Sequence, residues 1–175
     1  MFDALLMAWY LQVPVVIGGV LHMLAVTRDY LPALRLPIHA GLFGANKTWR
    51  GVLLVPLLTA FGALCLWPAE QWLGPQALLG QPLWLAGLIA GFGYVLAELP
   101  NSWLKRRLGI APGVTPSRWT VLGDQLDSGL GVALAYWLYL DLPTTVGLLY
   151  MLTFPLTALG VKRLLYWGRL KQSAV

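Results

Sequence analysis

The sequence contains few charged residues. Asp, Glu, Lys and Arg make up 11% of its 175 residues, whereas a typical soluble domain has about 25%. Hydrophobic residues account for 58%. These proportions exclude a soluble globular protein. They predict an integral membrane protein in which residues 1–175 form a single transmembrane domain, with no separate soluble module.

Cysteine and histidine are also scarce. The single cysteine, Cys65, lies inside an apolar run, which excludes a disulfide framework and a zinc site. The two histidines, His22 and His39, are far apart and have no partner motif, so neither supports a metal site or an activated nucleophile. The candidates for chemistry are therefore carboxylate, amide and basic side chains.

Long apolar runs dominate the rest of the chain and predict an all-α fold with about five transmembrane helices. The fourth run is short and carries acids at its start. We expect the spans at residues 4–26, 51–67, 82–99, 126–140 and 144–160. Two long loops, 27–50 and 101–123, separate them, and the middle of the first is expected to form a short helix or hairpin at the membrane interface.

The basic residues are confined to three segments. The loops after the first and third spans and the C-terminal tail hold four Lys or Arg each, which accounts for all 12. Cytoplasmic segments of membrane proteins carry such an excess. The pattern predicts a multi-pass protein of the cell (inner) membrane with its N-terminus outside and its C-terminus and both long loops in the cytoplasm. It also explains the net charge of +5 without a nucleic-acid partner.

Two carboxylates, Asp124 and Asp127, stand at the start of the fourth span. Helical spacing places them on one face together with Ser128 and Gly131. Acids at membrane depth are costly and are usually functional, and two close carboxylates repel unless a cation lies between them. Hard oxygen ligands of this kind suit Mg²⁺. The alternative is that both acids only complement the dipole at a helix N-terminus.

The end of the first basic loop, residues 44–51, is rich in hydrogen-bond donors. Lysine and arginine bind phosphates, and glycine allows the backbone to approach closely. The donors are Asn46, Lys47, Thr48 and Arg50. A P-loop is excluded because its full spacing is absent and no strand precedes the segment. The alternative is a juxtamembrane basic segment that holds lipid headgroups.

A second polar face follows the third span. If the helix continues through Pro100, four polar side chains share one face of it: Glu98, Asn101, Ser102 and Lys105. Arg106 follows Lys105 in the sequence and is included with this cluster. Lipid would not favour such a surface at the membrane boundary, although a solvated basic helix end is the alternative.

These three polar clusters fall on the same predicted side of the membrane. Basic donors beside acids that suit Mg²⁺ describe a site for a nucleoside diphosphate or triphosphate. Each cluster also lies at a helix end next to lipid. The residues therefore indicate phosphoryl or nucleotidyl transfer onto a lipid-borne group.

Three motifs carry a resemblance to a known family. They are the segment 44–51 with its Lys-Thr-Trp-Arg-Gly core, Asn-Ser-Trp-Leu-Lys-Arg-Arg-Leu-Gly-Ile at 101–110, and Leu-Gly-Asp-Gln-Leu-Asp at 122–127. In this order they resemble the motifs of CDP-archaeol synthases, which are related to the phosphatidate cytidylyltransferases. The resemblance implies a Mg²⁺-dependent nucleotidyltransferase of phospholipid biosynthesis. Such an enzyme transfers CMP from CTP to a lipid phosphate, giving a CDP-lipid and pyrophosphate.

The resemblance also implies roles for individual residues. Nucleotide or phosphate contacts would come from Asn46, Lys47, Thr48 and Arg50, and from a second set of Asn101, Ser102, Lys105 and Arg106. Asp124 and Asp127 would hold one or two Mg²⁺ ions and, with Lys47 and Lys105, would form the catalytic group. Glu98 is either a further metal ligand or a partner of Lys105.

Several alternatives stay open. The sequence departs from the family pattern at Asn46 and at Ser128 and Gly129. The acceptor is therefore a 2,3-bis-O-geranylgeranyl-glycerol-phosphate-like ether lipid, a phosphatidate-like ester, or another polyprenyl phosphate, and a homodimer is not excluded. A CDP-alcohol phosphotransferase is disfavoured because it needs further acids soon after Asp127. The other alternative is a small membrane transporter or a scaffold without catalysis, although a transporter would place its charges near the bilayer midplane.

Overall fold

The structure is a computed structural model that describes residues 2–73, 80–114 and 117–168. Within these ranges the regular secondary structure is helical, which confirms the predicted all-α class. A short 3-10 turn occupies Pro32–Leu34. The α-helices are α1 (Phe2–Tyr10), α2 (Val13–Thr27), α3 (Ala40–Phe43), α4 (Trp49–Leu64), α5 (Trp67–Leu73), α6 (Leu83–Arg107), α7 (Arg118–Leu140) and α8 (Thr144–Trp167).

Four helical stretches of the described chain are long and apolar enough to cross a membrane. They are Asp3–Thr27, Trp49–Trp72, Leu83–Arg107 and Thr144–Trp167. These stretches contain four of the predicted spans and indicate a membrane protein. The remaining predicted span, 126–140, is too short for a hydrocarbon core of roughly 30 Å at about 1.5 Å per residue. It forms the later part of α7, which is 23 residues long but carries polar side chains in its first half.

Large hydrophobic side chains point outward from the helices. Leu138 and Leu156, for example, are 71% and 69% exposed. Such a surface is unfavourable in water but suits contact with lipid chains. The orientation with the N-terminus outside and the C-terminus in the cytoplasm stays a prediction. Two of the basic residues of the tail on which it depends, Arg169 and Lys171, lie outside the described residues.

The second predicted loop, 101–123, is mostly helical. α6 continues through Pro100 to Arg107, as expected if the helix did not stop at the proline. α7 begins at Arg118, earlier than predicted, because the Ser117 hydroxyl accepts a hydrogen bond from the Thr120 amide and caps the helix. The connection between the two helices is therefore short, and it turns at Gly109 and Gly113, where φ is +73° and +77°.

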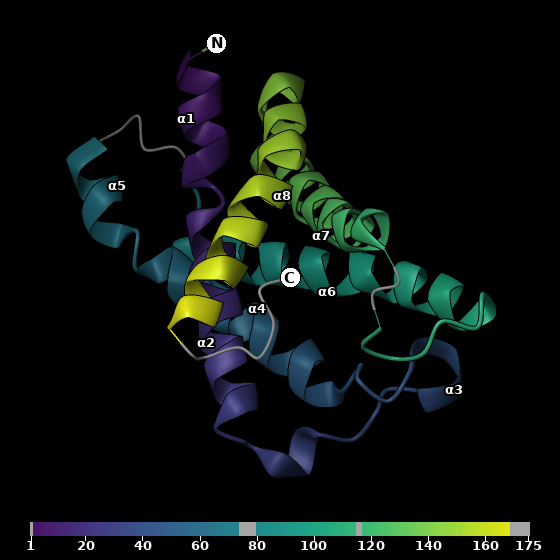
Figure 1. The fold of residues 1–175 in the computed structure, drawn as a ribbon. Coiled ribbons are helices and arrows are strands. Elements are labelled where there is room, and N and C mark those ends of the chain that lie inside the picture. Colours follow the sequence, from purple (N-terminus) through teal and green to yellow (C-terminus); the bar gives the residue numbers. More distant parts are fainter. Residues whose placement is uncertain (1, 74–79, 115–116, 169–175) are drawn as a thin grey trace.

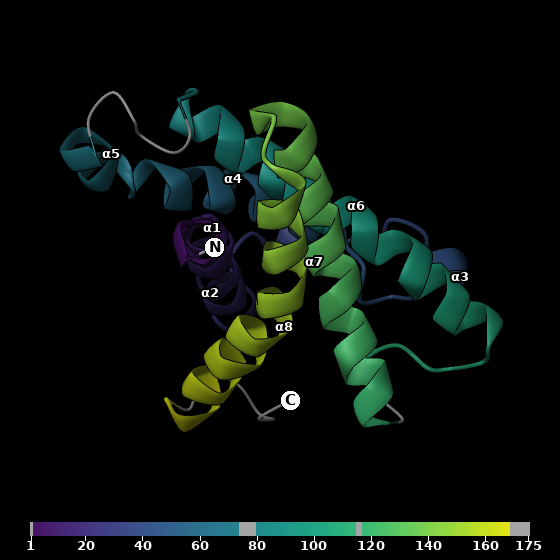
Figure 2. The same ribbon diagram turned by 90° about the horizontal axis from the view of Figure 1, so that it is seen from above.

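The sequence predicts a short helix or hairpin in the middle of the first loop. The structure has both: the short helices Pro32–Leu34 and α3, and a backbone return over residues 36–49, here called the 36–49 hairpin. The Ile38 amide donates to the Lys47 carbonyl at 2.9 Å, and the Trp49 amide donates to the Leu36 carbonyl at 3.0 Å. α3 forms the tip and packs against α6. Both ribbon views show α3 beside the C-terminal half of α6 (Figures 1 and 2). The hairpin thus brings Lys47 close to α6.

α6 and α7 cross at two glycines. A Cβ added at Gly131 would lie 2.3 Å from the Gly93 carbonyl oxygen, so the two backbones touch. Small residues allow such close approach between membrane helices. Gly131 shares a face with Asp124 and Asp127, so this crossing turns the acid-bearing face of α7 toward α6.

Candidate functional site

A polar cleft of about 200 Å³ lies between the 36–49 hairpin, the C-terminal half of α6 and the first turns of α7. All three predicted polar clusters contribute to it. Most of the predicted site residues line it: Asn46, Lys47, Glu98, Asn101, Ser102, Lys105, Arg106, Asp124 and Asp127. We call it the polar cleft.

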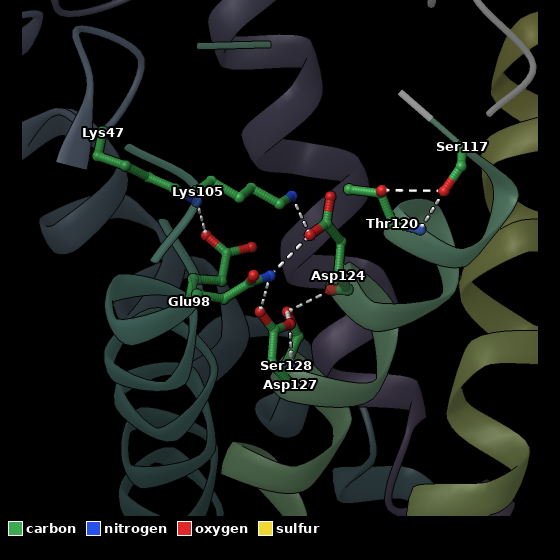
Figure 3. Close-up of polar contacts among 9 residues, drawn as sticks. Lys47, Glu98, Lys105, Ser117, Thr120, Asp124, Asp127 and Ser128 are labelled. Carbon is green, nitrogen blue, oxygen red and sulfur yellow. Dashed lines mark hydrogen bonds and ion pairs between the residues drawn. The ribbon is translucent and has the colours of Figure 1, made fainter. Parts of the chain in front are cut away.

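The two aspartates converge on one side chain from α6. Asn101 Nδ2 donates to Asp124 Oδ1 at 2.7 Å and to Asp127 Oδ2 at 2.6 Å. Lys105 forms an ion pair with Asp124 across the same gap (Figure 3). The amide and the ammonium together offset the repulsion between the two carboxylates.

Ser128, the next residue on α7, holds Asp127 in place. Asp127 Oδ1 accepts a hydrogen bond from the Ser128 amide and lies 3.1 Å from Ser128 Oγ. Ser128 is fully buried, so water does not compete for the hydrogen bond of its hydroxyl. One oxygen of Asp127 is therefore held by α7 itself, while the other points to Asn101.

The opposite wall of the polar cleft carries a second ion pair. Lys47 of the 36–49 hairpin pairs with Glu98 of α6 (Figure 3). Both side chains are about three-quarters buried. Glu98 had been expected to ligate metal or to pair with Lys105. In the structure its partner is Lys47, because Lys105 lies two turns further along α6 and reaches Asp124.

The donor set of the polar cleft can be compared with the needs of a metal ion. In the described part of the chain, no three His, Cys, Asp or Glu side chains are close enough to bind one ion. However, Asp124 Oδ1 and Asp127 Oδ2 lie within 2.7 Å of a common point, Asn101 Nδ2. Mg²⁺ commonly takes one or two carboxylates and completes its shell with waters and substrate phosphates. The residues therefore fit Mg²⁺ that is bound together with a phosphate ligand.

Arg106 also points to an anionic ligand. Its Nε and Nη1 atoms are buried and have no hydrogen-bond partner among the described residues. Unpaired buried donors on a charged group are costly. Since Arg106 lines the polar cleft, a phosphate bound there would satisfy them.

Two predicted contacts line a neighbouring cleft instead. Thr48 and Arg50 border a space of about 430 Å³ that shares Asn46, Lys47, Tyr94 and Glu98 with the polar cleft. Arg50 is only 7% exposed. Its Nη1 donates to Asp29 and to the Tyr30 carbonyl, each at 3.1 Å. The hairpin thus directs Arg50 back to the end of α2.

Four further polar residues belong to the site but are not among the predicted ones: Tyr94, Gln125, Ser128 and Lys162. Tyr94 stands one helical turn before Glu98, so an extended helical face would have included it. Gln125 and Ser128 flank the acids in the sequence. Lys162 comes from α8, and no local pattern connects it to the motifs.

Comparison with protein-family models, curated proteins and solved structures gave no significant match to this chain. The resemblance to CDP-archaeol synthases, and the roles that it implies, stay predictions that rest on the motifs and on the geometry of the polar cleft.

Proposed function

We propose that this chain is a Mg²⁺-dependent CTP:lipid-phosphate cytidylyltransferase. It would transfer CMP from CTP to a membrane lipid phosphate and release pyrophosphate. The observation that carries the proposal is the convergence of Asp124 and Asp127 on one point of a cleft that also contains Lys47, Lys105 and Arg106. The motif resemblance adds CTP as the donor and a lipid phosphate as the acceptor.

The charges of the polar cleft suit a metal triphosphate. Two of its lysines are paired with carboxylates, Lys105 with Asp124 and Lys47 with Glu98. When a triphosphate binds, the lysines can exchange these carboxylates for phosphate oxygens, and Asp124 becomes free to ligate Mg²⁺. The net charge of the cleft then stays nearly balanced.

The size of the polar cleft supports a place for the nucleoside outside it. Small-molecule sites usually measure about 300–1,000 Å³, whereas this cleft measures about 200 Å³. The triphosphate fills such a space, and the nucleoside extends past Lys47 into the neighbouring cleft. Asn46 and Thr48 border that cleft and are the candidates for orienting the nucleotide.

The reaction needs no general base. A phosphate monoester has a second pKa near 6, so the acceptor is largely dianionic at neutral pH. One of its oxygens attacks the α-phosphorus of CTP. A new P–O bond forms, the bond between the α-phosphorus and the bridging oxygen breaks, and pyrophosphate leaves with the electron pair.

The protein's contribution is position and charge. Lys47 offsets the negative charge of the bound triphosphate, and Lys105 and Arg106 also offset the charge of the departing pyrophosphate. Asn101 holds the two aspartates in register. A Mg²⁺ ion held by Asp124 and Asp127 would supply Lewis-acid polarisation of the phosphates.

Two samples of CTP, each labelled at one phosphate, test the proposal. The purified protein is incubated with Mg²⁺, a panel of ether, acyl and polyprenyl phosphates, and CTP that carries ³²P in either the α or the γ position. We expect α-label in the lipid fraction, γ-label only in pyrophosphate, and loss of both signals with EDTA. Label from the γ position in lipid would indicate a kinase, and no label from either position would remove the cytidylyltransferase proposal.

A further inference from the structure

An apolar groove of about 160 Å³ lies between α2 and α8, two helices that make few direct contacts. Its lining is mainly apolar, and its polar side chains are His22, Tyr94, Gln125 and Lys162. The α2 wall includes Val15, Val16, Gly19, Val20 and Met23, and the α8 wall includes Phe154, Ala158, Val161 and Leu165. We call it the α2–α8 groove.

The groove runs along the helices at membrane depth. Val15, Gly19 and Met23 are spaced by four residues, so they form one stripe about 12 Å long on α2. The stripe begins near the middle of the stretch Asp3–Thr27 and approaches the end at which the basic loop starts. The groove therefore leads from the hydrocarbon layer toward the side that carries the polar cleft.

The groove and the polar cleft meet at three residues. Tyr94, Gln125 and Lys162 line both spaces. An amphiphile whose chains lie in the groove would thus present its headgroup to the polar cleft. Lys162 at this junction complements a phosphate headgroup in charge.

Two adjacent glycines on α2, Gly18 and Gly19, differ in their surroundings. A Cβ added at Gly18 would lie 2.5 Å from Thr59 Oγ1, so Gly18 serves the packing of α2 against α4. A Cβ added at Gly19 would meet nothing within 4 Å. Gly19 is exposed and lines the groove, so a larger side chain at this position would project into the groove.

We propose that the α2–α8 groove binds the hydrocarbon chains of the lipid-phosphate acceptor and delivers its phosphate past Lys162 to the polar cleft. This inference rests on the proposed transferase function. It assigns the acceptor a side entrance from the bilayer, which adjoins the cleft proposed for the nucleoside at His22, Val55 and Tyr94. Selection among acceptors by chain length and bulk then depends on Gly19 and the stripe around it.

Filling the groove tests this inference. Gly19→Leu places a side chain into the open space, and Gly160→Leu is the matched control because Gly160 on α8 is exposed, has open space and lies outside the groove. We expect Gly19→Leu to lower kcat/KM for a long-chain lipid phosphate by about tenfold. The KM for CTP and the rate with a short-chain, water-soluble lipid phosphate stay at wild-type values, as do all parameters of the control.

The outcomes separate the groove from the function. If the wild type transfers CMP and Gly19→Leu equals Gly160→Leu, the groove proposal is wrong while the function stands. A loss of thermal stability with unchanged lipid kinetics would indicate a structural lipid and would also overturn it. If the wild type transfers no CMP, the proposed function fails. The groove is then tested with a photoactivatable phosphatidate that carries a diazirine in its tail. We expect the probe to label residues 15–23 and 154–165 of the wild type, and to label them less in Gly19→Leu. Labelling elsewhere in the wild type would overturn the groove proposal.

Discussion

The two walls of the polar cleft each carry one lysine–carboxylate pair, but they are built differently. On one wall Lys105 and Asp124 join α6 to α7, two helices whose backbones touch at Gly93 and Gly131. On the other wall Lys47 and Glu98 join the 36–49 hairpin to α6. The helix wall is thus fixed by close packing, whereas the hairpin wall depends on a loop. We infer that the helix wall governs the chemical step and that the hairpin wall governs nucleotide binding.

The largest effect is expected at the centre of the helix wall. Asp127→Asn keeps the shape of the side chain but removes one of the two anionic ligands, so kcat should fall by about 10²–10³-fold. The matched control is Asp141→Asn at the far end of α7, where φ is +51° and asparagine is well tolerated. The rate of CMP transfer at saturating substrates measures both. Full activity of Asp127→Asn would defeat the metal site.

A smaller loss is expected from the lysine of the same wall. Lys105→Gln removes the cation beside Asp124, and kcat should fall by roughly tenfold or more while the KM for CTP changes little. Arg107→Gln removes a charge from the same helix at an exposed position outside the polar cleft, and its kinetics should equal those of the wild type. If Lys105→Gln raised only the KM, the division between the two walls would be wrong.

Substitution in the hairpin wall should change the KM for CTP and not kcat. Lys47→Gln should raise the KM for CTP by about tenfold and leave kcat nearly unchanged, since in the proposed site Lys47 contacts the nucleotide and not the acid pair. Arg28→Gln in the same loop is an exposed control away from both clefts. Initial rates over a CTP series give both constants. A fall in kcat alone would place Lys47 with the helix wall.

The smallest effect is expected at Glu98. If Glu98 serves as the partner of Lys47, Glu98→Gln weakens a partly exposed ion pair and changes kcat/KM by no more than about fivefold. If Glu98 were instead a third metal ligand, the loss would match that of Asp127→Asn, and extra Mg²⁺ would restore part of the rate. A Mg²⁺ titration of Glu98→Gln and Asp127→Asn side by side decides between these roles.

The predictable features are those that depend on local helical spacing. The common face of Asp124 and Asp127, and the continuation of α6 through Pro100, both follow from residues a few positions apart. The start of α7 was misplaced because its first turns are polar and look like a loop in hydropathy. Ser117 was the available signal, since serine is a favoured helix cap.

The pairing between elements could not be predicted from local patterns. Lys105 meets Asp124 because Gly93 and Gly131 set how α6 and α7 cross. Glu98 meets Lys47 because the 36–49 hairpin folds back against α6. Arg50 pairs with Asp29 because of the return of the hairpin, and its phosphate contact stays a prediction. Each of these contacts joins residues that are far apart in the sequence.

The most direct test of the central claim is metal binding itself, measured with Mn²⁺ in place of Mg²⁺ by electron paramagnetic resonance. We predict that the protein binds Mn²⁺ in the presence of a non-hydrolysable CTP analogue, that omission of the analogue weakens binding, and that Asp127→Asn abolishes it while Asp141→Asn does not. Equal Mn²⁺ binding by the wild type and Asp127→Asn, or no binding with the analogue present, would contradict a metal–triphosphate site at Asp124 and Asp127.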